Sequence, residues 1–378
     1  MSDILIFGDT IRSQELRHEV PLMIPDAFLY VERDGVRHLT CSSLEEPRLA
    51  ELDGFVFHPF EEFGLDELRR TTSSRVDMID EIVVRAAGAL GVSQALVPAS
   101  FPVLTADRLR AAGVALSADQ PVFDGRRRVK TALELAGVRR AQAAAEAGMA
   151  AARELLAAAV PGGGILTLEG RPLTSERLKT AIAGAFLEHG ANAEEFVVSH
   201  GPQAAIGHHL GEGEIRAGET IVIDLWPGDN ASACFADMTR TFVVGEILEE
   251  VAEWHRLCKE ALERALAEVR PGVTGRALFD GTCELFEAAG YPTQRTKTDG
   301  ETLARGFMHS LGHGVGLAVH EEPFLALNGH APLVAGDVIA IEPGLYRPGF
   351  GGLRLEDLVL VSENGAERLT SFSYELTP

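Results

Sequence analysis

The chain has 378 residues and a formal net charge of −22, and 46% of its residues are hydrophobic. This length predicts two domains, and the composition is that of a globular enzyme, which excludes a disordered or fibrous protein. The strong negative charge offers no basic field to nucleic acid or anionic lipid, so neither is expected as a partner. The start of the chain, MSDILIFGDTIRSQE, lacks the basic and long apolar segments of a signal peptide, and we expect a cytoplasmic protein without a membrane span.

Residues 1–125 are predicted to form a small α/β domain. The short apolar stretches ILIF, AFLYVE, FVF and ALVPA alternate with helix-like segments, of which the longest covers residues 66–90. The histidines of this domain are isolated in sequence, and we interpret them as surface or hydrogen-bonded polar residues. The domain boundary is expected within residues 119–128, where a proline, a glycine and three consecutive arginines interrupt the pattern.

Residues 126–378 are predicted to form a second domain from two similar halves. The expected helices span residues 130–159 and 174–189 in the first half and 249–269 and 274–289 in the second. A strand-like or His-rich segment follows each helix pair, and such halves can form a curved antiparallel sheet that is backed by helices and has a concave cleft. The glycines at 162–164 are interpreted as a helix terminator, because no GK[ST] follows them as in a phosphate loop.

Two aspartates flank the turn in the segment ETIVIDLWPGDNASACFADMTRTFVVGE. Asp224 closes one β-branched run and Asp237 opens the next, which predicts that they are partners on a β-hairpin with both carboxylates facing one cleft. An aspartate at the end of a strand is more often a turn residue. This pair alone therefore leaves metal binding open.

The segment GFMHSLGHGVGLAVHEEP interleaves three histidines, His309, His313 and His320, with glycines. The glycines exclude a stable helix, and the proline that follows Glu321 and Glu322 also excludes an HExxH zinc helix. An extended or looped backbone is expected instead, because glycine lets the main chain approach a bound ion closely.

Two glutamates occur in apolar β-patterns further along the chain. Glu342 follows DVIAI and precedes a Pro-Gly turn, and Glu356 lies in GGLRLEDLVLV. A carboxylate in an apolar strand is costly unless it is paired or binds a metal. An ion pair with Arg354 would explain Glu356 but not the other three acids. If all four acids converge with His313, two divalent cations would neutralise them, and such oxygen-rich ligation suits Mn²⁺ without excluding Co²⁺, Zn²⁺ or Fe²⁺.

The order of these residues resembles a known family. The candidate ligands occur in the order Asp224, Asp237, His313, Glu342 and Glu356. With SHGPQAAIGHH upstream, this order resembles the "pita-bread" metallopeptidases, which include aminopeptidase P, prolidase and methionine aminopeptidase. The resemblance covers residue 130 to the end. It implies an α+β fold with a pita-bread catalytic domain in residues 126–378, a smaller α/β domain of the creatinase N-terminal type in residues 1–125, and a homodimer.

The resemblance also implies a role for each candidate ligand. Asp224 would bind one metal, and Asp237 and Glu356 would bridge two metals. His313 and Glu342 would complete the second metal site. A bridging hydroxide, acidified by both cations, would attack the peptide carbonyl, and Glu342 would transfer a proton to the leaving amine.

Four further residues match positions of the same family. His208 and His320 match two histidines that are not ligands and that stabilise the oxyanion. Arg354 matches the arginine of the proline-specific members, which favours that branch over the methionine aminopeptidases, and its guanidinium would hold a substrate carboxylate or order the metal ligands. His309 is assigned to substrate binding.

The expected activity is metal-dependent hydrolysis of Xaa-Pro peptide bonds, as a dipeptidase or as an aminopeptidase. Asp224 and Asp237 are two residues further apart than is usual in proline peptidases, and this enlarged loop leaves substrate length and end-specificity open. A creatinase-like C–N hydrolase and a non-catalytic binding protein are alternatives on the same fold. The complete ligand set argues against both, because a scaffold has no need to bury four acids.

Overall fold

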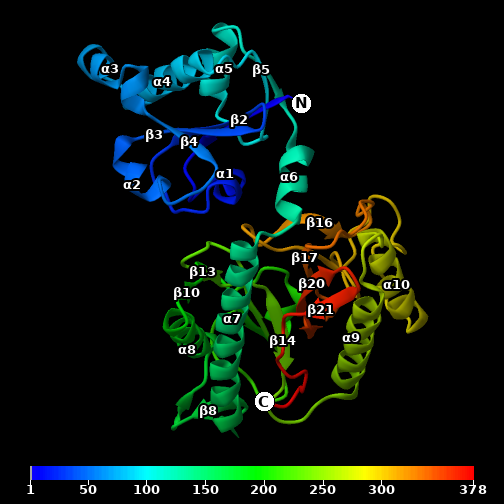
Figure 1. Ribbon diagram of the computed structural model, residues 1–378. Coiled ribbons are helices and arrows are strands. Elements are labelled where there is room, and N and C mark those ends of the chain that lie inside the picture. The colour runs from blue at the N-terminus through cyan, green and yellow to red at the C-terminus, as the bar shows by residue number, and fades with distance from the viewer. Residues whose placement is uncertain (1) are drawn as a thin grey trace. The chain divides into compact units, whose positions relative to one another are not determined.

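The computed structural model describes residues 2–378, whose contacts divide the chain into two compact units (Figure 1). The first unit ends at Arg127, and the second unit is Arg128–Pro378. Among the described residues, no helix has both the length and the apolar character that crossing a membrane requires.

The first unit is built on one six-stranded sheet with the strand order β4-β3-β2-β1-β5-β6. Its strands are β1 (Asp3–Gly8), β2 (Phe28–Arg33), β3 (Val36–Cys41), β4 (Phe55–Pro59), β5 (Gln94–Val97) and β6 (Ala115–Ala118). Its helices are α1 (Gln14–Glu19), α2 (Glu46–Leu49), α3 (Leu65–Thr71), α4 (Arg75–Ala89) and α5 (Val103–Ala111), and α6 (Gln120–Arg128) reaches the boundary. Successive residues of β1, Leu5 and Ile6, belong to separate apolar cores on the two faces of the sheet. The predicted small α/β domain is confirmed.

Three details of the first unit differ from the prediction. The helix expected over residues 66–90 is two helices, α3 and α4, because the Ser74 side chain accepts a hydrogen bond from the Asp77 amide and starts a new helix. The interruption expected within residues 119–128 is helix α6, whose proline lies in the first turn, where its missing N–H is tolerated. His38 and His58 are hydrogen-bonded residues, as interpreted from the sequence, but their partner is each other, because neighbouring strands β3 and β4 bring their ring nitrogens to 3.1 Å.

The second unit contains two antiparallel sheets with the orders β11-β12-β14 and β16-β15-β17-β20-β21. The first comprises β11 (Val197–His200), β12 (Ile221–Leu225) and β14 (Met238–Phe242). The second comprises β15 (Gly312–Gly314), β16 (Glu321–Leu325), β17 (Val338–Ile341), β20 (Asp357–Ser362) and β21 (Gly365–Arg368). Smaller pairings are β7 (Val160–Gly162), β8 (Ile165–Leu168) and β9 (Arg171–Pro172), β10 (Ala191–Asn192) with β13 (Gly228–Asp229), and β18 (Gly344–Arg347) with β19 (Gly351–Arg354).

The helices of the second unit come in two pairs, as the repeated pattern in the sequence predicts. They are α7 (Ala132–Ala158) and α8 (Ser175–Glu188) in the first half and α9 (Glu249–Glu268) and α10 (Gly275–Ala288) in the second. In Figure 1 one pair lies on each side of this unit, with the strands between them. Each pair covers its own apolar core. This is the predicted pair of similar halves.

Helix α7 begins at a capping box, in which Thr131 and Glu134 each bond the other's backbone amide. The buried face of α7 is rich in alanine and includes Ala141, Ala144 and Ala145, all fully buried. Side chains this small let α7 and α8 approach closely. The helix ends at Ala158, before the glycines that were interpreted as its terminator. Gly163 and Gly164, with φ of 64° and 89°, instead form the tight turn between β7 and β8.

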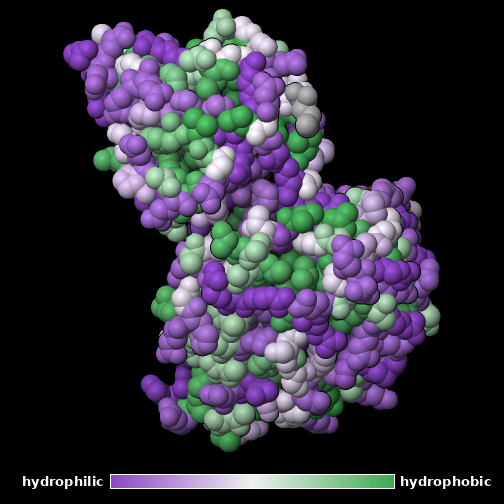
Figure 2. Space-filling view, in the orientation of Figure 1, coloured by the Kyte–Doolittle hydropathy of each residue, from purple (hydrophilic) through white to green (hydrophobic). Residues whose placement is uncertain are grey.

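Helix α9 shows how the acidic surface and the core are separated. Its inward residues Trp254 and Leu257 are 1% exposed. Its outward residues Glu253, Arg256 and Glu260 are joined by ion pairs of 2.8 and 3.0 Å. Figure 2 shows a mostly hydrophilic surface over α9 and α10. The charged residues of this helix therefore lie on a solvated face.

Candidate metal centre and substrate cavity

The alternation of side chains along β12 separates the core from a cavity of about 860 Å³. Ile221, Ile223 and Leu225 are buried in the apolar core of the first half. Val222, Asp224 and Trp226 line the cavity. Because β12 pairs with β14 in the register Asp224↔Thr239, the start of β14 lies beside Asp224. The predicted neighbourhood of Asp224 and Asp237 therefore follows from two adjacent antiparallel strands.

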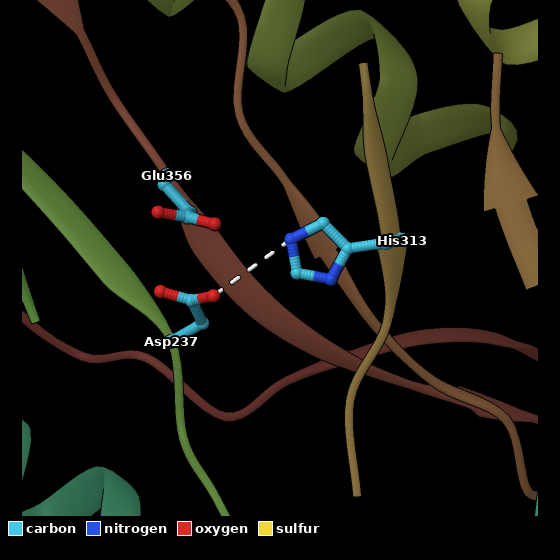
Figure 3. A group of neighbouring side chains, drawn as sticks. All are labelled: Asp237, His313 and Glu356. Atoms are coloured by element: carbon cyan, nitrogen blue, oxygen red, sulfur yellow. Dashed lines mark ion pairs between the residues drawn. The ribbon is translucent and has the colours of Figure 1, made fainter. Parts of the chain in front are cut away.

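Asp237, His313 and Glu356 form the tightest group of potential ligands. One ligand atom from each lies within 4.8 Å of the others, and all three residues are buried. Figure 3 shows their side chains pointing toward one another from three separate segments, with an ion pair of 3.7 Å between His313 Nε2 and Asp237 Oδ2. Asp237 precedes β14, His313 lies in β15, and Glu356 precedes β20. Residues from both halves thus meet in one place.

Asp224 and Glu342 lie at the edge of this group. Glu342 Oε1 is 3.7 Å from His313 Nε2, and Asp224 contacts the guanidinium of Arg354. The other carboxylate oxygen of Asp224, Oδ1, is buried and has no hydrogen-bond partner within the described part of the chain. All five predicted ligands line the same cavity.

In the chain alone, the ionised forms of these acids are disfavoured. Burial, reinforced by Glu356, Asp224 and Glu342, raises the pKa of Asp237 well above its usual range. Burial, reinforced by Glu342 and Asp224, raises the pKa of Glu356 in the same way, and burial raises the pKa of Glu342 to about 7.

The donor set itself fits divalent cations. Burial and the neighbouring His320 lower the pKa of His313 to about 4, which keeps the imidazole neutral as a metal ligand must be. Four carboxylates, of which Asp237 and Glu356 are buried and Asp224 and Glu342 are partly buried, supply the hard donors that such cations prefer, and one Asp224 oxygen has no partner within the described part of the chain.

Arg354 ties the acids together without pairing directly with Glu356. Its Nε donates to Thr239 Oγ1 at 3.0 Å, and the Thr239 hydroxyl donates to Glu356 Oε2 at 2.7 Å. Its ion-pair partners are Asp224 and, at 3.8 Å, Glu342. The ion pair with Glu356 considered from the sequence is therefore wrong, because Thr239 stands between the two groups.

Tyr346 and Thr239 are residues of the cavity region that sequence reasoning missed. The Tyr346 hydroxyl accepts a hydrogen bond from Arg354 at 3.3 Å and lies 2.9 Å from His309 Nε2. Its position four residues after Glu342, in EPGLY, places it in the short strand β18, but only the pairing with β19 brings it to Arg354. Thr239 follows Asp237 on β14, where a β-branched residue in a strand gives no signal of its own.

The three candidate histidines outside the ligand set, His208, His309 and His320, all line the cavity. The rings of His320 and His313 meet edge to face, with their centroids 4.2 Å apart. His208 is exposed and has a positive φ of 61°. Its neighbour His209 instead accepts a hydrogen bond from the Gly211 amide through Nδ1.

The enlarged loop between Asp224 and Asp237 is held by hydrogen bonds outside the cavity. Asp229 accepts two hydrogen bonds, of 3.0 and 2.8 Å, from Arg140 of α7, and a further one of 2.6 Å from the Ser232 hydroxyl. Of residues 225–236, all of which the structure describes, Trp226 alone lines the cavity. The loop therefore affects the cavity through a single indole.

The rest of the cavity wall is largely apolar. Among the described residues that line it, Arg354 is the one arginine or lysine. The larger apolar side chains are Ile206, Trp226, Leu303, Met308, Val319 and Phe324. The candidate metal ligands and the three further histidines thus face a cavity wall that suits uncharged side chains of a substrate.

Comparisons with known proteins match this arrangement. The sequence pattern of metallopeptidase family M24 matches residues 136–363. The chain is 34% identical over 252 residues to the probable dipeptidase PepE of Mycobacterium tuberculosis. The aligned segment covers 66% of this chain and 60% of the relative. It is 38% identical over 191 residues to the Xaa-Pro dipeptidase of Pyrococcus furiosus, covering 50% and 51% of the two chains. The chain thus matches between about half and 60% of the length of these curated relatives.

Solved structures resemble the chain over nearly its whole length. Dipeptidase PepE from Mycobacterium ulcerans has a TM-score of 0.77 and 28% identity, and the match covers 100% of this chain and 93% of that structure. Prolidase from Pyrococcus furiosus has a TM-score of 0.76 and 25% identity, with 99% and 97% covered. The family match includes every candidate ligand, and the chain belongs to metallopeptidase family M24, with the pita-bread fold of the prolidase structures.

Proposed function

We propose that this protein is a metallopeptidase that hydrolyses Xaa-Pro peptide bonds. The observation that carries the proposal is the group of four acids, two of them buried and two partly buried, which has one guanidinium for neutralisation and lines a cavity of about 860 Å³. Acids grouped in this way stay ionised only where something else supplies positive charge, and without it they take up protons. The apolar wall suits a proline ring, and relatives named Xaa-Pro dipeptidase support this substrate class.

The ligand set supports a dinuclear site. Asp224 would hold one cation, and His313 and Glu342 the other, with Asp237 and Glu356 shared between them. Two divalent cations at these donors supply the Lewis acidity that activates water and polarises the peptide carbonyl. Oxygen-rich ligation favours Mn²⁺, with Co²⁺ and Zn²⁺ as the alternatives.

The side chains around these ligands have separate tasks in the proposal. Glu342 takes up a proton from the attacking water and passes it to the leaving amine. His320 and His208 donate hydrogen bonds to the oxyanion that forms at the carbonyl.

Arg354 and His309 are assigned to the ordering of metal ligands and to substrate binding. Because Arg354 already contacts Asp224 and bonds Thr239, we assign it to the ordering of metal ligands and not to a substrate carboxylate. His309, held by Tyr346 and by the Ser310 carbonyl at 2.7 Å, contacts the substrate.

Several broader expectations also belong to this proposal. Residues 1–125 would form a creatinase-type N-terminal domain, and the protein would act as a homodimer in the cytoplasm on a peptide substrate, without nucleic acid or membrane partners. Family resemblance supports the first two of these, and the net charge of −22 supports the last.

One experiment tests the function. Chelated protein is supplied with Mn²⁺, Co²⁺ or Zn²⁺ and assayed on a Xaa-Pro dipeptide, a longer peptide that begins Xaa-Pro, and a peptide that begins with Met. Metal-restored cleavage of the dipeptide alone indicates a dipeptidase, and removal of the first residue of the longer peptide indicates an aminopeptidase. Failure to cleave any peptide with any metal would exclude the proposed activity.

A further inference from the structure

A buried ion pair lies outside the cavity, behind the segment that carries His313 and His320. Lys130 stands two residues before the start of α7, and Glu321 begins β16 directly after His320. Lys130 Nζ contacts Glu321 Oε1, and the two side chains are 3% and 2% exposed. Neither residue is among those that line the cavity. Because buried ion pairs contribute little net stability, this pair calls for another explanation.

The turn that joins β15 to β16 packs directly on this pair. A Cβ added at Gly316 would lie 2.6 Å from Glu321 Oε1 and 2.8 Å from Lys130 Nζ, so no larger residue fits without displacing a charged group. The Gly316 carbonyl accepts a hydrogen bond of 2.8 Å from the Phe235 amide. The turn is therefore held between the ion pair and the segment that leads to Asp237.

This turn connects His313 to His320, two of the histidines that line the cavity. β15 and β16 pair through Gly314↔Glu321, so Glu321 stands opposite the neighbour of His313. His320 ends the bend that precedes β16 and lines the cavity, whereas Glu321, the first residue of β16, is buried against Lys130 and does not line it. Any displacement of Glu321 moves the backbone of His320 with it.

We propose that Lys130 is a positioning residue, which holds His320 on the cavity wall by pairing with Glu321. The role of His320 toward the substrate rests on the proposed function, whereas its placement by Lys130 does not. The alternative is that the pair only stabilises the fold. The two readings differ when the pair is replaced by apolar side chains, which keep the packing but remove the electrostatic attachment.

The test compares Lys130→Met with the double variant Lys130→Met/Glu321→Leu. The single variant removes the cation that contacts the buried Glu321 carboxylate, and it should lose both Tm and kcat. The double variant removes both charges and should regain part of the Tm that the single variant loses, while its kcat stays about 10- to 100-fold low with KM changed little, because a small misplacement of a catalytic group costs this much. Recovery of kcat together with Tm would overturn the proposal. Arg128→Met, which breaks the nearby 2.6 Å pair with Asp337, is the matched control and should retain kcat.

A double-mutant cycle identifies the group that Lys130 positions. In a His320→Ala background, the apolar replacement of the ion pair should cause no further loss of kcat, because the positioned imidazole is absent. Losses that multiply independently would contradict the proposal.

A second readout does not depend on activity. The imidazole ¹⁵N–¹H signals of His320, identified by their loss in His320→Ala, should shift in the double variant of the Zn²⁺-loaded protein and not in Arg128→Met. Unchanged signals would overturn the positioning role. If the wild-type protein cleaves no peptide, the proposed function fails, and these signals still decide whether Lys130 places His320.

Discussion

Glu356 and Asp357 are consecutive buried acids whose side chains meet opposite environments. Asp357 is fully buried and is paired with Arg240 at 2.9 Å and with Arg368 at 3.2 Å. Glu356 receives a hydroxyl hydrogen bond from Thr239 and otherwise lies among other carboxylates. The chain therefore neutralises the acid on one side of this segment with its own arginines and leaves the acid on the cavity side without such a partner. Burial alone does not identify a metal site, but an unbalanced buried charge does.

The largest effect is expected on the cavity side. Asp237→Ala or Glu356→Ala should lower kcat by about 10³-fold or more, because each removes a donor that both cations would share in the proposed dinuclear site. The same changes should leave the metal-free protein folded, and thermal unfolding should show a Tm no lower than that of the chelated wild type, since one repelling acid is gone. Turnover at the wild-type rate in either variant would contradict the dinuclear site.

On the opposite side the same kind of change should act on stability. Arg240→Met removes one cation from Asp357 and also the hydrogen bonds of 2.9 and 2.6 Å to the carbonyls of Thr239 and Glu356. It should lower the free energy of unfolding by about 3–5 kcal/mol in urea titrations. Added Mn²⁺ should not restore the loss. If added Mn²⁺ fully restored the free energy of unfolding, the Asp357 side and the Glu356 side of this segment would not be independent.

The pH dependence of the metal-free protein sharpens the comparison. A carboxyl whose pKa is raised on folding stabilises the fold below its unfolded pKa, and the contribution is lost as pH rises through the folded pKa. For Glu342, whose pKa rises from 4.5 to about 7, the stability of chelated protein should fall across that interval. The loss should be on the order of 2–3 kcal/mol in urea titrations. Glu342→Gln should flatten the slope, and an unchanged slope in that variant would assign the effect elsewhere.

The smallest effect is expected from the apolar part of the cavity wall. Trp226→Ala should enlarge the space beside Asp224 and change the ratio of kcat/KM between Phe-Pro and Ala-Pro by about tenfold, the usual effect of apolar pocket size. Ser232→Ala lies in the same loop but outside the cavity and should leave the ratio unchanged. Equal ratios in all three proteins would show that the loop takes no part in selectivity.

Local pattern was sufficient to predict the framework of the molecule. Helix caps and periodicity predict α8 and α10 nearly to the residue, and the run ending at Asp224 predicts a strand with one face toward a cleft. The convergence of ligand-type residues could be anticipated because acids in apolar strands need a partner. The roles of these residues remain predictions.

Contacts that depend on distant pairing could not be predicted. The attachment of Arg354 to Asp224 joins positions 130 residues apart, and the bond from Tyr346 to Arg354 depends on the register of β18 and β19. The turn formed by Gly163 and Gly164 was interpreted as a helix end because glycine serves both purposes. In the first unit, the proximity of His38 and His58 requires the parallel pairing of β3 with β4.

The three candidate ligands of the tightest group lie in segments that are far apart in sequence and are therefore synthesised at different times. Asp237 is made with the first half, whereas His313 and Glu356 belong to the second, and Glu356 follows Asp237 by more than a hundred residues. When synthesis of the first half is complete, Asp237 is present, but His313 and Glu356 have not yet been made and the group of three is incomplete. A metal ion that requires all three side chains can therefore bind only late in the biosynthesis of this protein, after β14, β15 and β20 have come together.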